Sequence, residues 1–162
     1  MDIAVRLDDP NSPEARALLQ AAHELMQSLL PEPPPRALSL APLAAPESRV
    51  FIARMNLHAV GCCAMILHRD FAEIKRLYVA PEARRLGIAA RLLQAVERAA
   101  RQEGYNLLKL ESGARLTNAH RLYARSGFTA CGQFGAHAQS AASLFMEKHL
   151  RAAAPPPRSS SG

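Results

Sequence analysis

Residues 84–90, RRLGIAA, combine two positive charges with small side chains where a strand pattern gives way to a helix pattern. Small residues let backbone N–H groups approach a ligand closely, and the start of a helix adds partial positive charge. Arg84 and Arg85 add two guanidinium groups, which bind phosphate through paired hydrogen bonds. The segment therefore predicts a phosphate site. An ordinary strand-to-helix turn with two solvated arginines is the alternative.

The strand expected over residues 72–79, AEIKRLYV, changes its apolar alternation part-way along. The apolar residues change parity between Ile74 and Leu77, so the pattern slips by one residue there. An inserted β-bulge residue produces such a slip, and it leaves backbone groups unpaired by the neighbouring strand. Pro81 marks the turn that follows.

A helix is predicted after this turn, because apolar residues recur there with the helical period. The residues that define this stripe are Ala89, Leu92, Leu93, Val96 and Ala100. Gly104 is the expected end of the helix, since glycine is common just beyond a helix C-terminus.

A second motif, NAHRLYARSGF, begins at Asn118. Thr117 or Asn118 is the expected cap of a short helix that carries Tyr123 on its apolar face. Gly127 is the expected end, and Phe128 supplies the hydrophobic contact that often follows a glycine C-cap.

Together these segments resemble the GNAT superfamily of N-acetyltransferases, whose acetyl-CoA loop reads Gln or Arg, two residues, Gly, one residue, then Gly or Ala. Here the loop motif stands at Arg84, Gly87 and Ala89, behind Leu77-Tyr78-Val79 and Pro81. The family's second motif stands here at Asn118, Leu122-Tyr123 and Gly127-Phe128. The resemblance covers residues 50–150, and the two motifs occur in the family's order.

The resemblance implies an α/β (α+β) fold with a mixed, mostly antiparallel central sheet of about six to seven strands, flanked by about four helices. One domain over residues 1–151 is expected, followed by a disordered Ala/Pro/Ser tail at 152–162. The implied activity is transfer of an acetyl group from acetyl-CoA, as co-substrate and without a metal, to a primary amine by direct attack. The alternative is a non-catalytic acyl-CoA-binding module of the same fold, used for sensing or interaction.

The remaining elements follow from apolar patterns along the chain. Strands are expected over residues 3–7, 50–55, 59–67, 106–111, 128–132 and 142–150, and helices over 13–29 and 37–46. The consecutive strands before residue 79 predict an antiparallel meander. The nearly continuous apolar run at 60–67 predicts a central strand covered on both faces.

The resemblance implies that acetyl-CoA contacts the slipped strand, the loop and the second motif. These residues are Leu77, Tyr78, Val79, Arg84, Arg85, Leu86, Gly87, Ile88, Ala89, Ala90, Asn118 and Tyr123. The N–H groups of the loop would hold the pyrophosphate. An N–H group of the slipped strand would face the oxyanion that develops on the thioester.

Tyr123 is the candidate general acid, since a phenol can donate a proton to the CoA sulfur; an aromatic packed in the core is the alternative. Glu73 and Glu111 are the candidates for the base, because they lie on strands that flank the cleft of this fold. Each could instead pair with a nearby cation, and a water relay could replace a base residue. Those cations are Lys75, Arg76 and Lys109. Asn118 would bond the pantetheine arm or simply cap its helix.

The charge balance narrows the partners. Twenty Lys and Arg against 14 Asp and Glu give a net charge of +6, which suits an anionic ligand such as CoA. An aromatic content of 5% without Trp, and no recognised binding motif, argue against nucleic acid as the main partner. No apolar run of about 20 residues and no signal pattern occur, so a cytoplasmic protein without membrane contact is expected. The amine acceptor is left undefined, and a homodimer stays open.

The cysteines are the last candidates for chemistry. Cys62 and Cys63 are adjacent within an apolar run, and neither they nor Cys131 shows CxxC spacing. Buried thiols that pack as small hydrophobes are therefore expected for the adjacent pair, with a nucleophilic role as the alternative.

Overall fold

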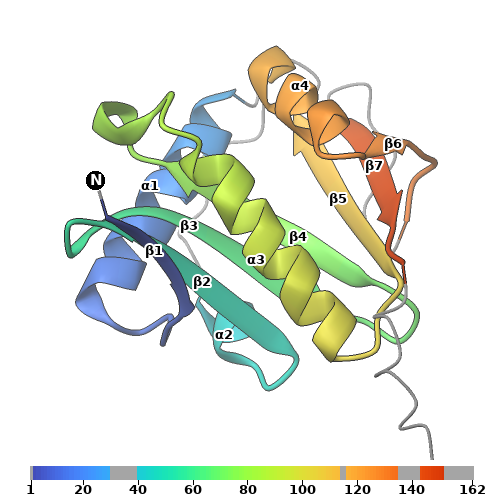
Figure 1. Ribbon diagram of the computed structural model, residues 1–162, viewed down its shortest axis with the longest axis horizontal. Helices are drawn as coiled ribbons and strands as arrows, with labels where there is room; N and C mark the ends of the chain where they lie inside the picture. The colour runs from blue at the N-terminus through green and yellow to red at the C-terminus, as the bar shows by residue number, and fades with distance from the viewer. Residues whose placement is uncertain (1, 30–39, 114–115, 135–142, 152–162) are drawn as a thin grey trace, which may run out of the picture.

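The structure is a computed structural model that describes residues 2–29, 40–113, 116–134 and 143–151 (Figure 1). Its strands are β1 Ile3–Leu7, β2 Ser48–Met55, β3 His58–Leu67, β4 Ala72–Val79, β5 Leu107–Gly113, β6 Thr129–Ala130 and β7 Ser143–His149. Its helices are α1 Pro13–Leu29, α2 Ala41–Ala44, α3 Ile88–Gln102 and α4 Thr117–Arg125, with a 3₁₀ turn, η1, at Pro81–Ala83. The strands form one sheet in the order β1-β2-β3-β4-β5-β7-β6.

This sheet is mixed and mostly antiparallel, as expected. Strands β1 to β4 pair antiparallel with their neighbours and form the predicted meander. Of the strand pairs that the structure describes, β4 with β5 is the one that runs parallel, because α3 carries the chain back across the sheet between them. Seven strands and four α-helices in the described residues confirm the predicted α+β architecture.

Helices cover both faces of the sheet, and Figure 1 shows α3 crossing one face while α1 and α2 lie behind. Helix α3 buries Leu92 and Val96 in a core cluster that also includes Tyr123 of α4. Helices α1 and α2 bury Leu19 and Leu43 in the cluster on the opposite face, called here the α1 face. The adjacent Cys62 and Cys63 belong to opposite clusters, which confirms that β3 is a central strand covered on both faces.

The helix ends expected at Gly104 and Gly127 are confirmed, and the start of α1 is capped. Ser12 Oγ accepts the N–H of Ala15 at 3.3 Å. Gly104 and Gly127 follow α3 and α4 with φ of +86° and +94°, a region that glycine enters without steric cost.

The predicted cap of α4 is wrong. The helix starts at Thr117, Leu116 occupies the N-cap position, and no side chain supplies a cap hydrogen bond. The N–H of Leu116 instead bonds the carbonyl of Gly113, at 3.0 Å, which fixes Leu116 just before the helix. The carbonyl of Leu116 then accepts the first helical bond, from His120, so neither Thr117 nor Asn118 is needed as a cap.

Strand β6 and two other segments differ from the expectation or are only partly described. Strand β6 is shorter than the strand expected over 128–132, although Cys131 still bonds the carbonyl of Phe145 beyond its end. Within the helix expected over 37–46, the structure has the shorter α2, Ala41–Ala44, and only residues 37–39 lie outside the described residues. The tail from residue 152 also lies outside them. Within the described ranges, none of the helices combines the length and apolarity that a membrane crossing requires.

Candidate active site

A β-bulge interrupts the pairing of β3 with β4. Cys62 pairs with Tyr78, whereas Ala64 pairs with Lys75, so β4 holds one more residue than β3 between these pairs. Arg76 lies in this bulge with φ +58°, and its carbonyl oxygen accepts a hydrogen bond from the Cys62 thiol at 3.3 Å. The slip in the apolar alternation is thereby confirmed as a bulge, at the predicted place.

Strands β4 and β5 separate beyond this point. Their parallel pairing runs only from Ala72 opposite Leu108 to Ile74 opposite Leu110. Strand β5 continues on β7 instead, and Figure 1 shows β4 and β5 diverging toward α4 and the start of α3. Residues 77–79 therefore have no ladder partner on the β5 side among the described residues, which leaves a splay in the sheet beside the bulge.

The loop before α3 presents a row of unpaired N–H groups. Gly87 is the N-cap residue with φ +77°, and Arg85 also has positive φ, at +65°. The N–H groups of residues 85–90 make no hydrogen bond to any described residue. A Cβ placed on Gly87 would meet no atom within 4 Å, so the space over the loop is open. These N–H groups and the helix start give the concentrated positive potential that an anion needs.

The two arginines of the loop differ in their local roles. Arg84 donates from Nε to the carbonyl of Val79 at 3.1 Å, which ties the loop to the end of β4. Arg85 is exposed and is part of the open surface of the loop. Arg84 thus fixes the loop on β4 and Arg85 is an exposed cation of the loop, and their contacts with phosphate stay a prediction.

Tyr123 packs on the opposite side of the splay from α1. Its side chain is 7% exposed and makes an edge contact with Phe128, with ring centroids 5.8 Å apart. Burial raises the pKa of the Tyr123 phenol well above its usual value, and the nearby Cys63 thiol adds to this. Cys63 lies opposite the bulge, so the phenol is close to the point where β4 and β5 part. It is a protonated donor without a hydrogen-bond partner among the described residues.

Asn118 lies apart from this buried donor. It is exposed in the first turn of α4. The structure places it on the helix beside the splay without a described contact to the loop, so its contact with pantetheine stays a prediction.

Glu73 and Glu111 both lie on the α1 face. Their neighbours Ile74 and Leu110 belong to the α3-side cluster, and side chains alternate between faces along a strand. Glu73 is 3% exposed; its Oε1 is 2.9 Å from His68 Nε2, and its Oε2 is 3.9 Å from Lys75 Nζ.

Glu111 lies across the splay on β5. It accepts a 2.6 Å hydrogen bond from Ser143 Oγ. The alternative in which the carboxylates pair with nearby cations thus holds for Glu73 with Lys75, while Lys109 lies over the rings of Phe71 and Phe134.

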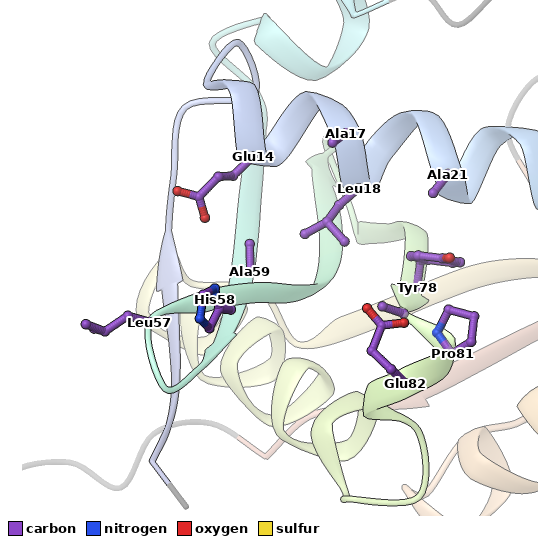
Figure 2. Close-up of a pocket in the computed structure, with 11 residues that line it drawn as sticks. Glu14, Ala17, Leu18, Ala21, Leu57, His58, Ala59, Tyr78, Pro81 and Glu82 are labelled. Atoms are coloured by element: carbon purple, nitrogen blue, oxygen red, sulfur yellow. The ribbon is translucent and has the colours of Figure 1, made fainter.

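A cavity of about 510 Å³ opens elsewhere on the α1 face, between α1 and the ends of β3 and β4 (Figure 2). Its lining includes Tyr78, Leu18, His58 and two carboxylates, Glu14 and Glu82. Because the Tyr78 side chain lines this cavity, any contact that Tyr78 makes in the splay comes from its backbone.

The buried Cys62 is neutral, since burial raises the pKa of its thiol to about 12.

Comparison with known proteins identifies the family of this site. A sequence profile of the Acetyltransferase (GNAT) family matches residues 15–128. The chain belongs to the GNAT family of acetyltransferases. It is 37% identical over 144 residues to a protein named IAA acetyltransferase from Azospirillum brasilense, covering 86% of this chain and 94% of that one.

Solved structures of GNAT-type proteins share the fold. A Klebsiella pneumoniae protein described as an acyl-CoA N-acyltransferase superposes with a TM-score of 0.77 at 31% identity, over 92% of this chain and 98% of that one. A GNAT family acetyltransferase from Elizabethkingia anophelis, solved with acetyl-CoA bound, gives a TM-score of 0.66 at 19% identity, over 91% and 98% of the two chains. The second likeness shows the fold alone.

The sequence analysis missed two residues that bond the candidate bases, Glu73 and Glu111. His68 bonds Glu73, and Ser143 bonds Glu111. The signal for His68 was present, because a tight turn after residue 67 brings it beside the first residues of β4, where His68 N–H bonds Phe71. Ser143 had no local signal, since its position depends on how β7 pairs with β5.

Proposed function

We propose that this GNAT-family protein uses acetyl-CoA to acetylate a primary amine by direct attack. The observation that carries the proposal is the row of unpaired N–H groups at residues 85–90, directly beside the splay between β4 and β5. A pyrophosphate bound at the loop would direct the rest of the cofactor along residues 77–79, whose backbone has no described partner on that side. The thioester then lies at the bulge.

The chemistry needs an attacking amine, a donor to the oxyanion, an acid for the leaving thiolate and a base for the amine proton. The amine nitrogen attacks the thioester carbon, a C–N bond forms and the C–S bond breaks. A backbone N–H of residues 77–79 stabilises the oxyanion. Tyr123 gives its proton to the departing thiolate, and burial keeps that proton in place at neutral pH.

The amine must lose a proton, and two carboxylates lie on the face from which it approaches. Glu73 is enclosed and bonded to His68, whereas Glu111 is half-buried and bonded to Ser143. Either can accept the proton directly or through water. The cofactor assignment covers Leu77, Tyr78, Val79, Arg84, Arg85, Leu86, Gly87, Ile88, Ala89, Ala90, Asn118 and Tyr123.

The test is CoA release from acetyl-CoA with a panel of amines, followed by mass spectrometry of the products. The panel includes amino acids, polyamines and peptides with free N-termini. A mass gain of one acetyl group on an amine supports the proposal. Tight acetyl-CoA binding without acetylation of any amine would favour the non-catalytic module instead.

A further inference from the structure

Arg76 holds an unusual backbone conformation for an arginine. It lies in the bulge of β4 with φ +58°, a region in which side chains with a Cβ are strained and glycine is not. Strain of this kind persists where the surrounding structure enforces it, and it points to a use for the residue that bears it. The side chain is therefore the part of Arg76 that needs an explanation.

The guanidinium of Arg76 has no anionic partner in the described part of the chain. Nη1 lies 3.6 Å from the sulfur of Met26, in the last turns of α1. Nε is enclosed and makes no hydrogen bond. Burial lowers the pKa of the guanidinium, and the adjacent Cys62 thiol is neutral and does not compensate its charge. Arg76 as a whole is half-buried, and even a partly buried charge without a counterion costs stability unless a ligand supplies one.

The nearby carboxylates are already engaged. Glu73 is bonded to His68 and lies near Lys75, and Glu111 accepts from Ser143. Neither forms an ion pair with Arg76 among the described residues. Among the described residues, Arg76 is thus a cation on the α1 face at the splay that is free to bind an anion.

The position of this cation matches the approach of the acceptor. The phosphate loop opens at the start of α3, so a cofactor held there reaches the splay from the side of α3 and α4. The amine must then arrive from the α1 face. Arg76 points to that face, since its guanidinium meets α1, and it is adjacent in sequence to Leu77 at the splay.

We propose that Arg76 binds a carboxylate of the acceptor, so that the substrate is a small amine that also carries a carboxylate, such as an amino acid. Nε and Nη2 make no hydrogen bond to the described residues, and this edge of a guanidinium matches a carboxylate with two parallel hydrogen bonds. Because Nε is enclosed, the side chain must turn on the Met26 contact to present this edge to the acceptor. The inference rests on the proposed acetyl transfer and names the class of its acceptor.

The test compares each of the 20 common L-amino acids with its carboxamide as acceptor, in the wild type and in Arg76→Met, Arg76→Lys and Arg98→Met. Arg98 is exposed on α3 and is the control for loss of one arginine charge. The wild type should prefer the best amino acid over its amide by about tenfold or more in kcat/KM. Arg76→Met should remove the preference by raising KM for the acid about 10- to 100-fold, the usual effect of losing a hydrogen bond to a charged group.

The companion variants separate charge from shape. Arg76→Lys should recover part of the preference, because it keeps the charge but not the planar pair of donors. Arg98→Met should keep the wild-type preference. A wild type that acetylates acids and amides equally, or an Arg76→Met variant that keeps the preference, would overturn the proposal for Arg76 while leaving acetyl transfer intact.

Failure of acetyl transfer is recognised separately. If acetyl-CoA binds but no amine is acetylated, calorimetry of the same amino acids with the CoA-bound protein decides the role of Arg76. Binding that Arg76→Met weakens about tenfold or more supports the carboxylate site. Absence of binding, or equal binding by the wild type and Arg76→Met, rejects it.

Discussion

The phosphate loop and the α1 face of the splay are built in opposite ways. The loop comes from one continuous segment, residues 84–90. Its N–H groups at residues 85–90 donate no hydrogen bond to a described residue. The α1 face takes Glu73, Arg76 and Glu111 from two strands and adds partners from two further segments. A site made of backbone depends on few side chains, whereas a site made of side chains can change with each acceptor.

Mutations in the two regions should therefore change different measured properties. Changes at the loop should alter acetyl-CoA binding for every acceptor. Changes on the α1 face should alter turnover for particular acceptors and leave acetyl-CoA binding unchanged. The splay between them, where Tyr123 lies, should affect the chemical step alone.

The largest effect is expected from Gly87→Glu. The new carboxylate would stand over the open N–H groups and repel phosphate, so isothermal titration should detect no acetyl-CoA binding. Gly104→Glu is the matched control, since Gly104 also has positive φ and open space around its Cα. Both variants should lose about 1 kcal/mol of stability from the strained backbone, but only Gly87→Glu should lose binding. Wild-type affinity in Gly87→Glu would mean that the phosphates bind elsewhere.

Tyr123→Phe tests the splay. Removal of the hydroxyl should lower kcat by about 10²–10⁴-fold, while acetyl-CoA affinity and melting temperature change little, because the phenol makes no hydrogen bond to the described residues. Tyr105→Phe gives the opposite pattern in stability, since the Tyr105 hydroxyl donates to the carbonyl of His68; a loss of about 1 kcal/mol is expected.

The pH profile adds a second check on Tyr123. Its raised pKa keeps the acid protonated, and this form is lost only as pH rises through that raised value. Deprotonation of Tyr123 should therefore cause no fall in kcat up to about pH 10, the ordinary value for tyrosine. Full activity in a folded Tyr123→Phe variant would assign the proton to water and leave Tyr123 as a core aromatic.

Glu73→Gln and Glu111→Gln test the α1 face. The residue that accepts the amine proton should lose about 10²-fold in kcat when changed to the amide, and acetyl-CoA affinity should stay at the wild-type value in both variants. Each glutamine can still accept the bond from His68 or Ser143, so stability should change little. Equal and small losses in both variants would indicate a water relay.

The same contrast explains what the sequence could predict. The loop, its glycine and the bulge could be read from local spacing, because each depends on neighbours within a few residues. The exit of β5 from β4, the bond from Ser143 to Glu111 and the unpaired guanidinium of Arg76 depend on which strands meet in space. The wrong cap at Thr117 or Asn118 has a related cause, since the bond from Leu116 to Gly113 decides where α4 begins.

Arg84→Ala should give the smallest effect and refine the account of the loop. The backbone N–H groups remain in place in this variant, so acetyl-CoA binding should weaken only about tenfold. Part of that loss comes from the bond of Arg84 to Val79, which fixes the loop on β4. Loss of one cation at the phosphate site should also make the logarithm of the dissociation constant less sensitive to salt.

Arg98→Ala is the control for charge on the same helix. Arg98 is exposed in α3 and lies more than two turns beyond the helix start at Ile88, so removal of its side chain should leave affinity and salt dependence unchanged. If Arg84→Ala weakens binding without altering the salt dependence, its contribution is to hold the loop rather than to pair with phosphate. If it flattens the salt dependence, the guanidinium contacts the phosphates. A loop that binds through its backbone predicts in either case that Arg84→Ala keeps most of the affinity that Gly87→Glu removes.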